Sequence, residues 1–194
     1  MKKIHYIALL LVGLLASCNT NDDGFYLNKF IDTTNMIVIG PHSSTYTVNE
    51  KLYVKASIPR LVAEPGQSTL IDVKETTGAD AFAFSYLIEK QNGDNWEVVY
   101  ADNNQIDLVK GGLLNGPYLY SNCQYYDSSD SYEYEAGFPL VSAGTYRLSF
   151  GYNGEATDRV NIRSESIQGN IIMNLNSTVA GLDSEGYYNF TVTN

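Results

Sequence analysis

The chain has 194 residues and a formal net charge of −10, with 22 acidic side chains against 12 basic ones. This negative charge repels phosphate backbones and anionic lipid headgroups, which argues against nucleic acid as a partner and against purely electrostatic membrane binding. The length suits one domain of generous size, and no proline-rich or low-complexity linker divides it.

Residues 1–17 have the organisation of a secretory signal peptide. Two lysines follow the initial methionine, and an apolar run over 7–15 is too short to span a membrane as a helix. Ala16 and Ser17 then supply the small residues that a signal peptidase requires next to its cleavage site.

The sequence Leu15-Ala16-Ser17-Cys18 resembles the bacterial lipobox, in which an aliphatic and two small residues precede a cysteine. The resemblance implies that Cys18 receives a diacylglyceryl group and becomes the first residue of the mature protein. Two or three chains such as palmitate would hold it durably, since each buried CH₂ contributes about 0.8 kcal/mol and one chain is marginal. An ordinary signal peptide with a chance cysteine is the alternative.

The residues after Cys18 bear on location. Asn19 is not the aspartate that retains enterobacterial lipoproteins in the inner membrane, and Asn21-Asp22-Asp23 resembles the acidic tract of surface-exposed lipoproteins of the Bacteroidota. The resemblance implies an outer-membrane protein whose lipid anchor is its membrane contact, on either the periplasmic or the extracellular face. A solvated polar tether explains the tract equally well.

We expect residues 18–35 to form the lipidated cysteine and a tether that runs into the fold. Within it, Asp32-Thr33-Thr34 resembles the short motif at which Bacteroidota attach O-glycans, which implies Thr33 as an acceptor. Motifs this short also recur by chance.

Residues 36–194 show a hydrophobic period of two, which predicts strands with one buried face. Phe82, Phe84, Tyr86 and Ile88 alternate with smaller or polar residues, and the Asn-Gly turn within 91–95 predicts a hairpin. No amphipathic helix is expected after the signal. The expected strands are 36–39, 44–48, 52–57, 68–74, 82–90, 96–100, 105–109, 117–121, 145–152, 160–163, 169–175 and 187–192.

Two patterns resemble immunoglobulin-like and fibronectin type III domains. One is the hairpin Phe84–Lys90 with Trp96–Val98; the other is Gly144-Thr145-Tyr146, which resembles the tyrosine corner. The resemblance implies an all-β, immunoglobulin-like β-sandwich with additional strands and no disulfide, because Leu148 stands at the usual cysteine position. Gly186 and Tyr188 repeat this spacing, as a second unit or as another strand entered through a glycine turn.

Taken together, the lipobox, the segment TYTVNEKLYVKASIP and the sandwich pattern resemble small outer-membrane lipoproteins of the Bacteroidota.

Few residues are suited to catalysis. His42 is the only histidine after the signal and is expected in an exposed turn, and no GxSxG motif accompanies it. Cys123 is expected to be a small buried hydrophobe, and one histidine with one free cysteine makes a zinc site improbable. We therefore expect no enzyme.

The most unusual stretch is 117–137, which is rich in tyrosines and acids. Its tyrosines either cover the core from an edge strand and a long loop or form a recognition surface for a glycan or protein. Asp127, Asp130 and Glu133 could instead bind calcium, although their spacing fits no EF-hand, and no other cofactor is expected. The candidate binding residues are Tyr118, Tyr120, Tyr125, Tyr126, Tyr132 and Tyr134.

The expected function is that of a surface-anchored, non-enzymatic binding or assembly module of the cell envelope, with a glycan or envelope protein as partner. One alternative is a surface hydrolase acting on carbohydrate through two carboxylates, for which the abundant acids provide many pairs. The other is a purely structural envelope component.

Overall fold

The computed structural model describes residues 25–151 and 157–194, which form an all-β, sandwich-like fold without a disulfide in those ranges. The predicted fold class is thereby confirmed. Cys18 and the signal segment lie outside the described residues, as does Tyr152.

The strands follow the chain with short connections, and one short helix interrupts them. They are β1 (Leu27–Thr34), β2 (Ile37–Gly40), β3 (Thr45–Thr47), β4 (Lys51–Pro59), β5 (Leu61–Ala63), β6 (Leu70–Asp72), α2 (Val73–Thr77), β7 (Ala81–Asn92), β8 (Asn95–Val98), β9 (Asp107–Lys110), β10 (Gly112–Asn115), β11 (Leu119–Tyr126), β12 (Ser131–Pro139), β13 (Gly144–Phe150), β14 (Arg159–Glu165), β15 (Ile171–Thr178) and β16 (Tyr187–Thr193).

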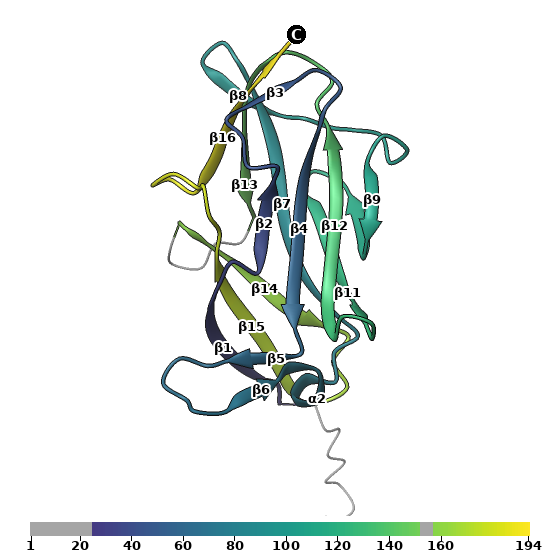
Figure 1. The fold of residues 1–194 in the computed structure, drawn as a ribbon, viewed down its shortest axis with the longest axis vertical. Coiled ribbons are helices and arrows are strands. Elements are labelled where there is room, and N and C mark those ends of the chain that lie inside the picture. The colour runs from purple at the N-terminus through teal and green to yellow at the C-terminus, as the bar shows by residue number, and fades with distance from the viewer. Residues whose placement is uncertain (1–24, 152–156) are drawn as a thin grey trace, which may run out of the picture.

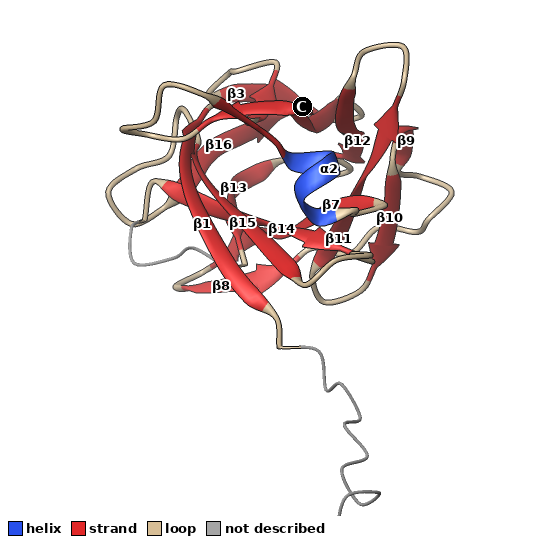
Figure 2. Cartoon of the chain, turned by 90° about the horizontal axis from the view of Figure 1, so that it is seen from below, coloured by secondary structure: helices blue, strands red, loops and turns tan. Residues whose placement is uncertain are grey.

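Most strands belong to one large, curled sheet with the order β1-β15-β14-β7-β11-β12-β4-β2. The long strand β7 organises it, because its first half pairs with β14 and β11 and its second half with β13 and β8. β2, β4 and β12 form a front layer, with β7, β13, β14 and β15 behind them (Figure 1). Viewed from below, the strands curve around α2, which lies at this end of the molecule (Figure 2).

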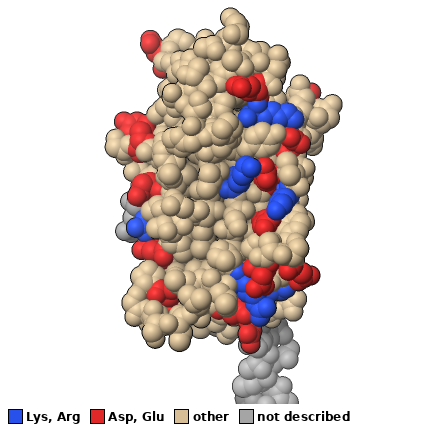
Figure 3. Space-filling view, in the orientation of Figure 1, with Lys and Arg blue, Asp and Glu red and all other residues tan. Residues whose placement is uncertain are grey.

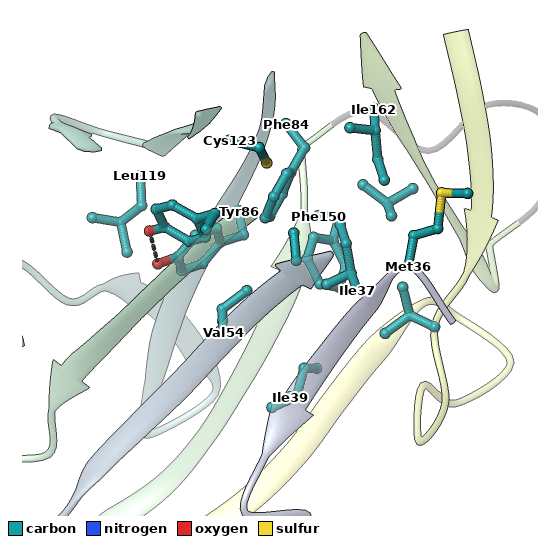
Figure 4. Close-up of a cluster of buried hydrophobic side chains, with 14 of the residues drawn as sticks. Met36, Ile37, Ile39, Val54, Phe84, Tyr86, Leu119, Cys123, Phe150 and Ile162 are labelled. Atoms are coloured by element: carbon teal, nitrogen blue, oxygen red, sulfur yellow. Dashed lines mark hydrogen bonds between the residues drawn. The ribbon is translucent and has the colours of Figure 1, made fainter. Parts of the chain in front are cut away.

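The core lies between these layers and is rich in aromatic rings. Ile37 and Val54 from the front layer meet Phe84 and Tyr86 of β7, and each of these side chains is at most 3% exposed (Figure 4). The Tyr86 hydroxyl is satisfied within the core by the hydroxyl of Tyr134 at 2.8 Å. Burial raises the pKa of both phenols, so both stay neutral.

The two patterns that resemble immunoglobulin-like domains form the local structures that they predict. β7 and β8 make a hairpin whose turn includes Gly93 at φ 61°, a conformation that glycine adopts readily. Gly144 begins β13 and Gly186 directly precedes β16, and both glycines have positive φ. β13 and β16 are antiparallel neighbours in one sheet. The repeated spacing therefore marks two paired strands of one fold, not a separate second unit.

The tyrosine corner is formed by Tyr146, which is 1% exposed. Its hydroxyl donates to the backbone carbonyl of Ser142 at 2.8 Å and lies 3.0 Å from the Ser142 hydroxyl. This closes the turn that leads into β13.

We expect Tyr146→Phe to lower the free energy of unfolding by about 1–2 kcal/mol, because the Ser142 carbonyl loses its buried donor. Urea denaturation measures the change. Tyr118→Phe is the matched control, since that ring is 51% exposed, and it should change the unfolding free energy little. Equal effects of the two substitutions would contradict the corner's role.

The expectation of a tether up to residue 35 is wrong, because Leu27–Thr34 forms β1. This strand pairs in parallel with β15 along its whole length, and Ile31 is 1% exposed in the core. The sequence did not predict this strand because Ile31 is its one buried residue, so LNKFIDTT carries no run of alternating apolar residues. Thr33 accordingly lies in a strand, and its hydroxyl oxygen is buried without a hydrogen-bond partner, so the folded protein does not present it as an accessible glycan acceptor.

Two other expectations differ from the structure. Only Leu70–Asp72 of the expected strand 68–74 is extended; Val73 starts α2, which Asp72 caps by accepting from the Glu75 amide at 2.9 Å. Ser131–Pro139, part of the expected long loop, is the strand β12. No helix in the described ranges is long and apolar enough to cross a membrane.

Candidate functional site

The tyrosine-rich stretch forms the hairpin of β11 and β12 inside the sheet rather than an edge strand with a loop. β12 lies between β4 on one side and β9 with β11 on the other. Tyr132 and Tyr134 are 0% and 1% exposed, so their prediction as binding residues is wrong. They line the core, where the Tyr132 hydroxyl donates to the carbonyl of Ala79 at 2.8 Å.

Tyr125 lies at the hairpin end and is already engaged by the protein itself. The ammonium nitrogen of Lys74 lies 3.3 Å from the centre of its ring, and its hydroxyl donates to Asp130. The Asp130 carboxylate raises the pKa of Tyr125. A sugar could stack on this face of the ring only by displacing Lys74.

The remaining tyrosines do not join Tyr125 in one surface. The Tyr126 hydroxyl accepts a hydrogen bond from the Gly111 amide at 3.0 Å, which ties the hairpin to the chain between β9 and β10. Tyr118 directly precedes β11 and is 51% exposed, and Tyr120 lies near the start of β11 and is 36% exposed. Both are at the opposite end of the strand from Tyr125. Partial burial and Glu165 raise the pKa of Tyr120 to about 12.

The three carboxylates expected to bind calcium are each next to a cation of this chain. Asp127 lies 3.9 Å from Lys74, Asp130 lies 3.9 Å from Arg60, and Glu133 pairs with Lys110. Residues 25–151 and 157–194 contain no group of three or more acids, histidines or cysteines placed to hold a metal ion. The structure therefore does not assemble these acids into one site.

A different surface brings polar and charged side chains together. Basic and acidic side chains alternate down the front face over β4 and β12 (Figure 3). We call this surface the charged stripe. It consists of Lys51, Tyr53 and Lys55 of β4, Asp107 and Lys110 of β9, and Glu133 and Glu135 of β12.

The stripe is a ladder of paired groups between neighbouring strands. Lys55 and Glu135 are directly opposite across β4 and β12, with 2.7 Å between the ammonium and carboxylate atoms. Asp107 accepts from the Tyr53 hydroxyl at 2.7 Å and lies 3.7 Å from the Lys51 ammonium. The pairs fix the orientation of otherwise mobile side chains on an open face.

The charges keep these groups in defined protonation states. Lys110 holds the pKa of Glu133 below its usual range, and the hydroxyl of Ser131 also donates to that carboxylate at 3.0 Å. Asp107 raises the pKa of Tyr53 by accepting its proton in a hydrogen bond. Glu133 therefore stays an ionised carboxylate, and Tyr53 stays a neutral phenol, at neutral pH.

Two depressions adjoin on this face, with volumes of about 340 Å³ and 460 Å³. Lys55 and Glu135 line both, so the ion pair forms the divide between them. The first is also lined by Val38 and the second by Val109, and each of these valines is 52% exposed. The face therefore combines apolar contact area with fixed polar groups.

The sequence of β4 contains a signal for this surface. In Lys51–Pro59 the residues alternate, so Leu52, Val54, Ala56 and Ile58 are buried while the intervening residues point outward. Three of those outward residues are Lys, Tyr and Lys at a spacing of two, which places them in one row. Their acidic partners come from β9 and β12, which sequence alone did not align with β4.

The other candidates behave as expected. Cys123 is free and 0% exposed, which confirms its prediction as a buried hydrophobe, and burial raises the pKa of its thiol. His42 is exposed, as predicted, and its ring contacts that of Tyr188 edge-on at 5.4 Å between centres.

Comparison with known proteins gives no relative: no protein-family model, no curated protein and no solved structure matches this chain.

Proposed function

We propose that this protein is a lipid-anchored, non-enzymatic binding module of the bacterial outer membrane, and that its charged stripe binds a glycan. The observation that carries the proposal is the pair of adjoining depressions that share Lys55 and Glu135. Each has the volume of a small-ligand site. Two neighbouring hollows on an open face suit consecutive units of a polymer.

The chemistry of the lining suits sugars. Hydroxyl groups of a sugar donate to carboxylates and accept from ammonium groups, and the stripe supplies both in fixed positions through Glu135 and Lys55. Tyr53 adds a partly exposed aromatic ring beside them. The apolar faces of a sugar ring can rest on the exposed valines.

The protonation states favour binding over acid catalysis. A glycosidase needs one carboxyl group whose pKa is raised so that it can donate a proton. Glu133 has its pKa lowered instead, and Glu135 is paired with Lys55. Glu133 therefore suits a hydrogen-bond acceptor rather than a general acid.

A glycan array probed with the purified protein tests the binding surface. We expect Tyr53→Ala to weaken binding of any selected glycan about tenfold or more, because the ring and the hydroxyl bond to Asp107 are both removed. Leu114→Ala is the matched control, as this side chain is 71% exposed and lies outside the stripe. Unchanged affinity of the Tyr53 variant would refute the site, and release of reducing sugar would assign a hydrolase instead.

Detergent-phase partitioning tests the anchor. The native protein is expected in the detergent phase and the Cys18→Ser variant in the aqueous phase, because only acyl chains on Cys18 would supply the membrane contact. A native protein that stays in the aqueous phase, or a variant that partitions as the native protein does, would overturn the lipid-anchored part of the proposal.

A further inference from the structure

β1 has one edge that pairs with no strand in the described parts of the chain. It stands at one end of the sheet order and pairs only with β15. The Leu27 amide donates to the Asn170 carbonyl and the Asn35 amide to the Thr178 carbonyl. In a parallel pair, every second residue directs both its N–H and its C=O to the same neighbouring strand. Because Leu27 and Asn35 bond toward β15, the odd-numbered residues of β1 face β15 and the even-numbered ones face the open edge.

The same segment concentrates exposed apolar side chains. Phe25, Tyr26, Leu27 and Phe30 are 81%, 55%, 50% and 61% exposed. An open strand edge with exposed aromatic residues is a template for pairing with another strand. Four such residues within six positions indicate a surface that is covered in the working protein.

We infer that the edge of β1 pairs antiparallel with β1 of a second copy of this chain about a twofold axis. In antiparallel pairing, a residue whose backbone N–H and C=O face the edge must lie opposite another such residue. Each even-numbered residue of one copy therefore lies opposite an even-numbered residue of the other. The inference does not depend on the lipid anchor or on the charged stripe.

Among the register that places Phe30 opposite Phe30 and the two registers adjacent to it, the side chains favour the first. When Phe30 lies opposite Phe30 of the second copy, the two exposed rings cover each other. Asn28 then lies opposite Asp32 of the second copy, so an amide donor meets a carboxylate. A shift of two residues one way places Phe30 opposite a carboxylate, and a shift the other way places Lys29 opposite Lys29.

A twofold contact also fits the symmetry of natural assemblies. An isologous interface uses the same patch on both copies and closes after two subunits, so the edge is removed without growth into a fibre. β1 carries no proline or bulge, which are common means of blocking an open edge.

Cysteine cross-linking of the detergent-solubilised full-length protein tests this register. Phe30→Cys should give a disulfide-linked dimer on oxidation, since directly opposite residues bring their Cα atoms within about 5.5 Å. Asn28→Cys is the matched control and should not cross-link, because the two position-28 residues would be separated by four residues, about 13 Å, along the strands. Equal cross-linking of both variants, or none with Phe30→Cys, would overturn the inference.

The wild-type chain separates this outcome from failure of the anchor. Cys123 is buried, so a disulfide-linked dimer of the wild type would report a free thiol at Cys18 and would count against acylation. Cross-linking that appears only with Phe30→Cys reports the β1 contact.

Sedimentation equilibrium in density-matched detergent gives an independent measure of protein mass. The wild type should be a dimer, and Phe30→Lys should raise the dimer dissociation constant at least tenfold, because two ammonium groups would then face each other. Leu114→Lys, which changes another exposed apolar residue, should leave it unchanged. A monomeric wild type, or equal behaviour of the two lysine variants, would refute the contact.

Discussion

Gly111→Ala is expected to lower the free energy of unfolding by about 3 kcal/mol or more. Gly111 joins β9 to β10 with φ +75°, in the left-handed region that side chains rarely adopt. An added Cβ would overlap the carbonyl oxygen of Asn122 and lie 2.9 Å from that of Glu133. Both are backbone atoms of paired strands, so neither can move without breaking the sheet.

Gly93→Ala separates the two causes of this loss. Gly93 has a similar φ of +61°, but nothing lies within 4 Å of an added Cβ there. Its loss should be about 1 kcal/mol, since only the backbone strain applies. Urea denaturation of both variants gives the comparison, and a loss at Gly111 no greater than at Gly93 would show that the strands yield to the side chain.

Phe84→Ala should cost about 3–5 kcal/mol, because it removes a ring at the centre of the core and leaves a cavity. Phe84 is 3% exposed and lies edge-on to Tyr134, with 5.6 Å between ring centres. It also lies 6.1 Å from the rings of Tyr86 and Phe150 (Figure 4). The front and back layers meet through these contacts.

Thermal and urea unfolding of Phe84→Ala should show this loss, whereas Phe84→Leu should retain about half of the stability that Phe84→Ala loses. Tyr100→Ala serves as the exposed aromatic control, since that side chain is 65% exposed. If Phe84→Ala is no more destabilising than Tyr100→Ala, the packing described for the core is incorrect.

The sequence predicted the fold best where burial alternates along a single strand. In β13, and in β7 from Phe84 onward, buried and less buried residues alternate, so the period of two was visible and led to the hairpin and the tyrosine corner. β12 was missed although Tyr132, Glu133, Tyr134 and Glu135 alternate in the sequence, because tyrosines among acids and serines are also typical of an exposed loop.

The candidate site was harder to predict because its parts come from distant segments. The many tyrosines of 117–137 predicted a recognition surface there. In the structure most of them are buried in the core or contact Lys74 or Gly111. The Lys55–Glu135 pair depends on the register between β4 and β12, which are about 80 residues apart by their numbering. Composition cannot supply such a register, because it arises only when the whole sheet forms.

The parallel pairing of β1 with β15 has a kinetic consequence. β1 lies far from its neighbour β15 along the chain, because Leu27 aligns with Ile171. Contacts of such large sequence separation slow folding, since the loop between them must close before the contact can form. β1 therefore stays without its neighbour until residues 171–178 are available, and a chain that stops before residue 171 cannot complete the sheet.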